Sequence, residues 1–200
     1  MGKNKLYTLI LILLITPFYL NDISNIYVKD WRWWVFIDYV SVKLFPLIVV
    51  TLLIINKKMK AEELGLKLQP IMPFITVFLM VTFIGTLIDQ NAYKLIAQFP
   101  GYHSLGNMPI IKSSAWNWAD LTVGLLMVGI FEELVFRGFM CAYLNRYTKN
   151  RFAIVLISSL AFGLIHWSGG LHVVLVTSVI GAVFMIAYLK TRSLPAIMLA

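Results

Sequence analysis

The sequence contains little charge for its length and almost no cysteine. Asp, Glu, Lys and Arg together make up 13% of the 200 residues, and only nine residues are acidic. The single cysteine, Cys141, excludes a disulfide framework within the chain. In place of charge, 60% of the residues are hydrophobic, and the mean hydropathy is +0.83. This composition excludes an ordinary soluble domain and indicates an integral membrane protein.

Apolar runs long enough to cross a bilayer recur along the chain, without a repeat or a low-complexity tract. The predicted spans are residues 6–20, 33–55, 71–88, 119–144, 152–167, 171–189 and a last one that begins near residue 194. The first run follows two lysines as in a signal peptide, but residues 16–19 offer no small-residue cleavage site. We therefore predict an all-α fold in one domain over residues 1–200, a polytopic transmembrane helical bundle of about 6–7 helices.

The basic residues alternate between the connections that join these spans. Eleven Lys and Arg residues lie in the N-terminal tail and in every second connection after it, whereas four lie in the other connections. By the positive-inside rule, this asymmetry predicts a multi-pass protein of the cell membrane with a cytoplasmic N-terminus. It also accounts for the net charge of +8, so we do not expect nucleic acid as a partner.

Two adjacent glutamates, Glu132 and Glu133, lie in the middle of the fourth predicted span. A charge at the bilayer centre costs roughly 2.5–3.5 kcal/mol, so an intramembrane charge indicates a functional site by default. Arg137 follows Glu133 by one helical turn, close enough to neutralise it. Glu132 has no such partner in the sequence, and this asymmetry makes it the candidate catalytic residue.

His166, at the end of the fifth predicted span, is the second candidate. A lone histidine on an apolar helix is more often a core group than a catalytic one, unless it can meet Glu132. A short basic turn around residues 146–151 joins the two spans and makes them antiparallel neighbours. Glu132 lies fourteen residues before that turn and His166 fifteen after it, so both lie roughly 21–22 Å from it. Equal depth on adjacent helices is what a shared site requires.

A carboxylate and an imidazole in a dry cavity are suited to activating water. Glu132 would be the general base, and His166 would orient the water or donate a hydrogen bond to the oxyanion that forms at a carbonyl. Glu133 and Arg137 would then be structural. The alternative is that all four residues form a buried polar network that stabilises the bundle or lines an ion path. The residues alone leave both interpretations open.

Asp38 and Lys43 are the other charged residues inside a predicted span, and no motif surrounds them. If that helix begins near Tyr39, Asp38 lies at the membrane interface and Lys43 can extend its ammonium towards water. We therefore predict that these two residues are interfacial and not part of a site.

At its polar residues the chain resembles the CAAX prenyl protease 2 and bacteriocin-processing family (CPBP, or ABI) of intramembrane glutamic endopeptidases. The first family motif, E-E-x-x-x-R, matches Glu132, Glu133 and Arg137. The second, F-x-x-x-H, matches Phe162 and His166. By resemblance, Glu132 is the water-activating base and His166 its catalytic partner, while the other three residues support the site.

The resemblance extends weakly to residues 63–66, so we expect an ABI-like core over about residues 57–200. A third family motif, H-x-x-x-N, is expected in the last helix. Residues 192–200 look like its lead-in, so we expect the domain to be incomplete at its C-terminus. His172, six residues past His166, is a poor replacement for the histidine of that motif.

The family implies a helical bundle with a conical intramembrane cavity. Its members remove the C-terminal tripeptide of prenylated CaaX proteins, cleave other membrane-associated peptides, or confer self-immunity to bacteriocins. The expected partners are therefore membrane lipid and a peptide or lipidated-protein substrate. We expect no cofactor and no metal ligands, with zinc as a secondary alternative.

Other classes of intramembrane protease lack their motifs here. The sequence has no H-E-x-x-H for a zinc enzyme and no G-x-G-D for an aspartyl enzyme, and residues 168–170 lack the preceding glycine of the rhomboid pattern. From a different class, the alternative function is a non-catalytic membrane immunity or partner protein on the same fold. A transporter with charged residues along a polar path comes third.

Overall fold

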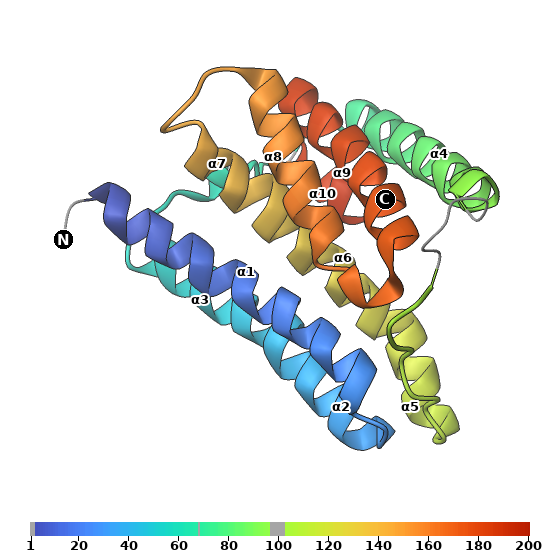
Figure 1. Cartoon of the computed structure of the whole chain (residues 1–200). Coiled ribbons are helices and arrows are strands. Elements are labelled where there is room, and N and C mark those ends of the chain that lie inside the picture. Colours follow the sequence, from blue (N-terminus) through green and yellow to red (C-terminus); the bar gives the residue numbers. More distant parts are fainter. Residues whose placement is uncertain (1–2, 68, 97–102) are drawn as a thin grey trace.

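The computed structural model describes residues 3–67, 69–96 and 103–200, which fold into helices joined by short connections (Figure 1). The α-helices are α1 (Lys3–Tyr27), α2 (Trp31–Asp38), α3 (Phe45–Ile55), α4 (Ile71–Ile96), α5 (Ser114–Ala119), α6 (Leu125–Glu133), α7 (Met140–Leu144), α8 (Arg151–Leu164), α9 (Leu171–Thr191) and α10 (Leu194–Met198). The shorter turns are the π-helical η1 (Tyr39–Leu44), η3 (Asp120–Gly124) and η4 (Leu134–Phe139) and the 3₁₀ turns η2 (Ala61–Leu64) and η5 (Trp167–Gly169). These described residues contain no strand, which confirms the all-α prediction.

Five of the predicted spans correspond to longer, continuous helices, whereas residues 152–167 correspond to the shorter α8 and the last predicted span to the short α10. α2, η1 and α3 follow one another from Trp31 to Ile55, and α5 to α7 with their π-helical turns run from Ser114 to Leu144. In the described part of the chain, four stretches are long and apolar enough to cross a membrane, namely 4–27, 31–55, 71–92 and 171–191, and α8 is a shorter apolar helix. The helical membrane bundle is confirmed, and the number of about 6–7 crossings stays a prediction.

Side-chain caps set where α2 and α8 begin. Asp30 accepts a hydrogen bond from the Arg32 N–H at 2.9 Å at the start of α2. Asn150 accepts from the N–H groups of Phe152, at 2.9 Å, and Ala153, at 3.3 Å, at the start of α8. The cap on α8 starts a new helix directly after the basic turn, and α8 packs against α7 and η4, as the short connection predicts.

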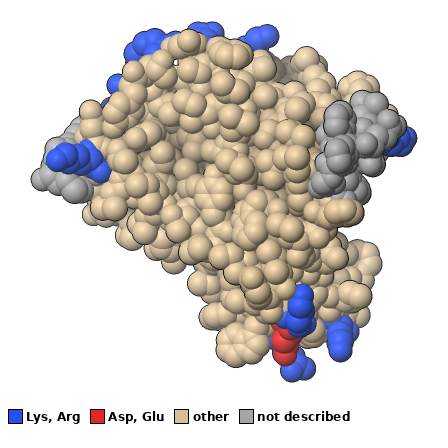
Figure 2. Space-filling model, viewed as in Figure 1, with Lys and Arg blue, Asp and Glu red and all other residues tan. Residues whose placement is uncertain are grey.

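Large apolar side chains remain exposed along the long helices, among them Ile12 of α1, Leu52 of α3 and Phe83 of α4. Figure 2 shows that uncharged residues cover the middle of one face, while Lys and Arg gather towards its edges. An apolar belt with charge at its margins is what contact with lipid requires.

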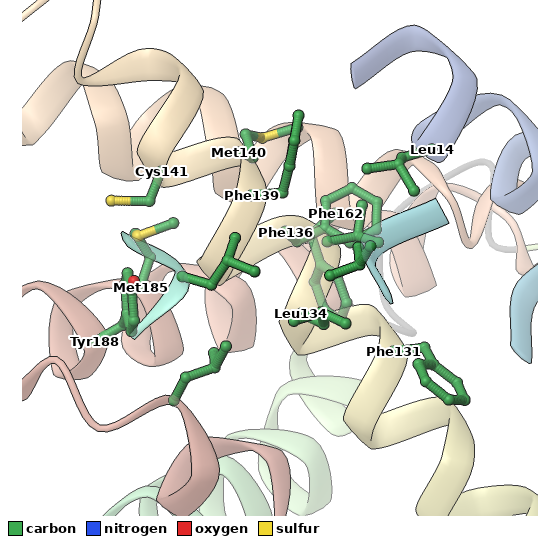
Figure 3. Close-up of a cluster of buried hydrophobic side chains, with 14 of the residues drawn as sticks. Leu14, Phe131, Leu134, Phe136, Phe139, Met140, Cys141, Phe162, Met185 and Tyr188 are labelled. Atoms are coloured by element: carbon green, nitrogen blue, oxygen red, sulfur yellow. The ribbon is translucent and has the colours of Figure 1, made fainter. Parts of the chain in front are cut away.

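The turn η4 lies at the centre of the bundle. All six of its residues are buried, and it packs against α1, α8, α9, α10 and η2. Phe136 and Phe139 of η4 meet Phe162 of α8 and Leu14 of α1 in the apolar cluster of Figure 3. Ser158 Oγ of α8 donates a hydrogen bond to the Phe136 carbonyl at 2.9 Å. The segment that follows the two glutamates is therefore held rigidly from several sides.

The segment 63–66 closes the core beside η4. Leu64 is fully buried, and Gly65 ends η2 in the left-handed conformation with φ of 79°. A Cβ on Gly65 would lie 2.6 Å from the ring of Tyr188 in α9, so a glycine allows both the turn and the close contact. The Gly65 carbonyl accepts a hydrogen bond from the Leu194 N–H at 3.2 Å. This short segment thereby joins α9 and α10.

Candidate active site

A cavity of about 170 Å³ opens between α1, the α2–η1 segment, the η3–α6 segment and the end of α8. Its lining residues are Phe18, Asn21, Asp22, Asn25, Trp34, Asp38, Val42, Lys43, Met108, Asp120, Gly124, Leu125, Val128, Glu132, Ile165 and His166. Glu132 and His166, which the helix lengths place at equal depth, therefore face the same internal space. Their catalytic roles stay a prediction, and so does the conical shape of the cavity.

The two adjacent glutamates have different surroundings. Glu132 is half-buried and lines the cavity, whereas the Glu133 side chain is withdrawn from it and the residue is 3% exposed. Glu133 Oε1 lies 2.8 Å from Arg137 Nη1, which confirms the ion pair expected from their spacing. Arg137 thus balances the charge of Glu133 outside the cavity, and Glu132 is the glutamate that a bound molecule could reach.

Phe162 connects the two motifs physically. The Arg137 guanidinium lies over its ring, with the Cζ atom 4.0 Å from the ring centroid. The His166 ring packs edge-on against the same phenyl ring at a centroid distance of 5.3 Å. Arg137 is completely buried, so this stack has no freedom to move into solvent. Phe162 therefore contacts both the arginine of the first motif and the histidine of the second.

The prediction that Asp38 and Lys43 are interfacial is wrong. Their helix begins at Trp31 and not near Tyr39, so Asp38 lies about two turns inside it. Asp38 is 6% exposed and Lys43 1% exposed, and the two form an ion pair. Lys43 Nζ also lies 3.7 Å from Asp120 Oδ1 of η3. Lys43 does not extend towards water because two carboxylates hold its ammonium beside the cavity.

The spacing of this cluster explains why no motif revealed it. Asp38 and Lys43 are five residues apart, a separation that places side chains on different faces of a regular α-helix. The π-helical turn η1 begins directly after Asp38 and contains Lys43, and it has more residues per turn than an α-helix. Asp120 comes from a segment much later in the chain. The available signal in the sequence was the cost of placing two charges within an apolar span.

The end of α1 contributes polar residues that were also missed. The predicted span stops at Leu20, whereas α1 continues to Tyr27 and brings Asn21, Asp22 and Asn25 to the cavity. Asn21 Nδ2 donates a hydrogen bond to Asp38 Oδ1 at 3.1 Å, which connects α1 to α2. Polar residues after an apolar run are typical of a membrane boundary, and only the packing of α1 turns them inward.

The donors at the cavity do not form the three- or four-ligand set of a zinc site. In the part of the chain that the structure describes, no group of three or more His, Cys, Asp and Glu residues could hold a metal ion. Glu133 is paired with Arg137, so it does not complete a ligand set with Glu132 and His166. His172 is not among the residues that line the cavity.

The helices and the cavity together define a helical membrane protein with a carboxylate and an imidazole in one internal polar site. Residues 114–200 match the profile of a protein family described as type II CAAX prenyl endopeptidase Rce1-like. The match includes both motifs and confirms the resemblance drawn from them over this part of the chain. Curated proteins and solved structures give no significant match to the chain.

Proposed function

We propose that this protein is an intramembrane endopeptidase that hydrolyses a peptide bond in a prenylated CaaX-type or other membrane-associated peptide. The observation that carries the proposal is that Glu132 and His166, one from each motif, line one cavity inside a helical bundle. The family match over residues 114–200 supports the reaction class. The positive-inside rule supports a cytoplasmic N-terminus, with the basic turn between α7 and α8 on the same side.

In the proposed reaction, Glu132 takes a proton from a water molecule in the cavity while the water oxygen attacks the scissile carbonyl carbon. His166 donates a hydrogen bond to the carbonyl oxygen as negative charge develops on it. The carbon–nitrogen bond then breaks, and the proton on Glu132 passes to the leaving amine. A cavity of about 170 Å³ has room for a few water molecules, so it suits the reacting bond and not a whole peptide.

The supporting residues hold the Glu132 and His166 side chains in position. The ion pair of Glu133 with Arg137 fixes the helix that carries Glu132, and Phe162 sets the position of the His166 ring. A general base works only within hydrogen-bond reach of the proton that it removes, so rigid support on both helices serves the reaction directly.

The decisive variant is Glu132→Gln, which keeps the shape of the side chain and removes the base. Cleavage of a farnesylated CaaX peptide by the purified protein in liposomes should fall by about 10²–10⁴-fold. The matched control is Glu62→Gln, because Glu62 is exposed on η2, away from the cavity. Cleavage by Glu132→Gln at the rate of the unchanged protein would overturn the proposed mechanism.

Two further experiments distinguish the proposed mechanism from a metal-dependent one and from a non-catalytic role. Activity should survive EDTA or phenanthroline, and loss of activity that added zinc restores would contradict the metal-free mechanism. If the unchanged protein binds the peptide without cleaving it, and Glu132→Gln binds equally well, the protein is a non-catalytic partner or immunity protein and not an endopeptidase.

A further inference from the structure

The turn that carries His166 is attached to α1 by a network of buried hydrogen bonds. The Ser168 N–H, two residues after His166, donates to Asp22 Oδ2 at 2.7 Å. Asn25 Nδ2 donates to Asp22 Oδ1 at 3.0 Å and to Ser168 Oγ at 3.1 Å. Trp34 Nε1 of α2 donates to Asn25 Oδ1 at 2.8 Å. Each polar atom in this network has a defined role as donor or acceptor.

The network is shielded from solvent and lies at the cavity. Asp22 and Asn25 are each 7% exposed, and Ser168 is 4% exposed. Asp22 and Asn25 line the cavity together with His166 and Glu132. A hydrogen bond from a backbone N–H to a carboxylate is among the stronger ones, and burial increases the cost of losing it.

A second contact holds the same turn to α1. Trp167 Nε1 donates to the Tyr19 carbonyl at 3.1 Å, and on the other side the Ser168 carbonyl accepts from the Leu105 N–H at 2.8 Å. His166 follows the last residue of α8, so the helix itself does not fix its backbone, and Phe162 of α8 contacts only its ring. The contacts from α1 supply the missing constraint.

We propose that Asp22 and Asn25 are positioning residues that set His166 relative to Glu132. This inference rests on the proposed function for its kinetic consequences. It assigns a role in the site to α1, which lies outside the family match over residues 114–200. Asp22 and Asn25 act through the Ser168 backbone and side chain, and neither takes part in proton transfer.

The donor and acceptor pattern yields a sharp test by exchanging the two side chains. Both Asp22 oxygens accept, so Asp22→Asn must turn its amide N–H towards the Ser168 N–H or towards Asn25 Nδ2. Asn25→Asp places a second carboxylate beside the first, where like charges repel. In the double variant Asp22→Asn with Asn25→Asp, the new amide oxygen accepts from Ser168 N–H and its nitrogen donates to the new carboxylate. That carboxylate also accepts from Trp34 Nε1 and from the Ser168 hydroxyl, so every group is satisfied again.

The kinetic experiment measures kcat and KM on the farnesylated peptide in liposomes. Each single variant should lower kcat by about 10–100-fold with little change in KM, since small displacements of a catalytic group have effects of this size. The exchanged double variant should return to within about threefold of the unchanged protein, a rescue that general destabilisation would not produce. The matched control is Asp89→Asn, an exposed position of α4, which should leave kcat unchanged.

The outcomes separate this inference from the proposed function. If Glu132→Gln is inactive while Asp22→Asn keeps full kcat, the positioning role is wrong and the endopeptidase stands. If the unchanged protein cleaves nothing, the positioning role is tested by NMR of ¹⁵N-histidine, because the chain has three histidines. The ring signals of His166 should shift in Asp22→Asn and return in the double variant. Unchanged His166 signals in Asp22→Asn would overturn the inference whatever the enzyme does.

Discussion

The two sides of the cavity each contain a buried ion pair, and the two pairs differ in what surrounds them. Beside α6, Glu133 and Arg137 do not line the cavity, and the guanidinium packs against an aromatic ring. Beside α1, Asp38 and Lys43 line the cavity, and Lys43 also approaches Asp120. The first pair is part of the framework of the site, whereas the second forms part of its surface.

The two ion pairs also differ in whether they can be predicted from spacing along one helix or only from the fold. A four-residue spacing brings Glu133 and Arg137 together on any helix, so their pairing needs no knowledge of the fold. The cluster of Asp38, Lys43 and Asp120 needs a π-helical turn and a helix from later in the chain. Three predictions compare how much the Glu133–Arg137 pair and the cluster of Asp38, Lys43 and Asp120 contribute to the free energy of unfolding.

The largest effect on stability is expected for Arg137→Met. Glu133 would stay buried without its cation, and breaking a buried pair in this way costs about 3–5 kcal/mol. Titration of the purified protein with SDS from a mild detergent measures the loss as a shift in the unfolding midpoint. The double variant Glu133→Gln with Arg137→Met should recover most of the loss, because no unpaired charge remains. Equal stability of the single and double variants would show that the pair does not support the framework.

A smaller effect is expected for Lys43→Met. Asp38 and Asp120 would lose the ammonium between them, but both line a cavity that water can enter, and Asp38 keeps its hydrogen bond from Asn21. We expect a loss of about 1–3 kcal/mol, measured in the same SDS titration. The double variant Asp38→Asn with Lys43→Met is the matched control and should be more stable than the single variant. A loss as large as that of Arg137→Met would mean that the cavity is closed to water.

The smallest effects are expected where glycines make room for the two clusters. A Cβ on Gly181 would lie 2.9 Å from the Phe162 ring beside Arg137, and a Cβ on Gly124 would lie 2.6 Å from Asp120 Oδ1. We expect Gly181→Ala to cost about 1–2 kcal/mol, as overpacking does, and Gly124→Ala less, because its neighbours can move into the cavity. The thermal midpoint in detergent measures both changes.

Gly85→Ala is the control for these substitutions, since its nearest neighbour would be 3.4 Å away, an ordinary contact. It should leave the midpoint nearly unchanged. A larger loss for Gly124→Ala than for Gly181→Ala would reverse the expected order and show that the cavity surface is packed as tightly as the framework.

Much of the motif side of the cavity could be predicted because it depends on distances along helices. The ion pair of Glu133 with Arg137 follows from the pitch of one helix, and the common depth of Glu132 and His166 follows from two helix lengths and a short turn. The predicted boundary at Leu20 was too early, since a polar run after an apolar one has the same pattern whether it faces water or a cavity.

Local spacing and composition determined the helical bundle, its apolar surface and the residues of the two motifs, because each follows from periodicity within one helix or from the cost of burying charge. Only the tertiary structure decided that α1 and η1 face the same cavity and that Asp22 and Lys43 belong to its lining. The physical reason is that these contacts join segments far apart in the chain, and the direction in which a helix turns its polar face depends on the helices packed around it.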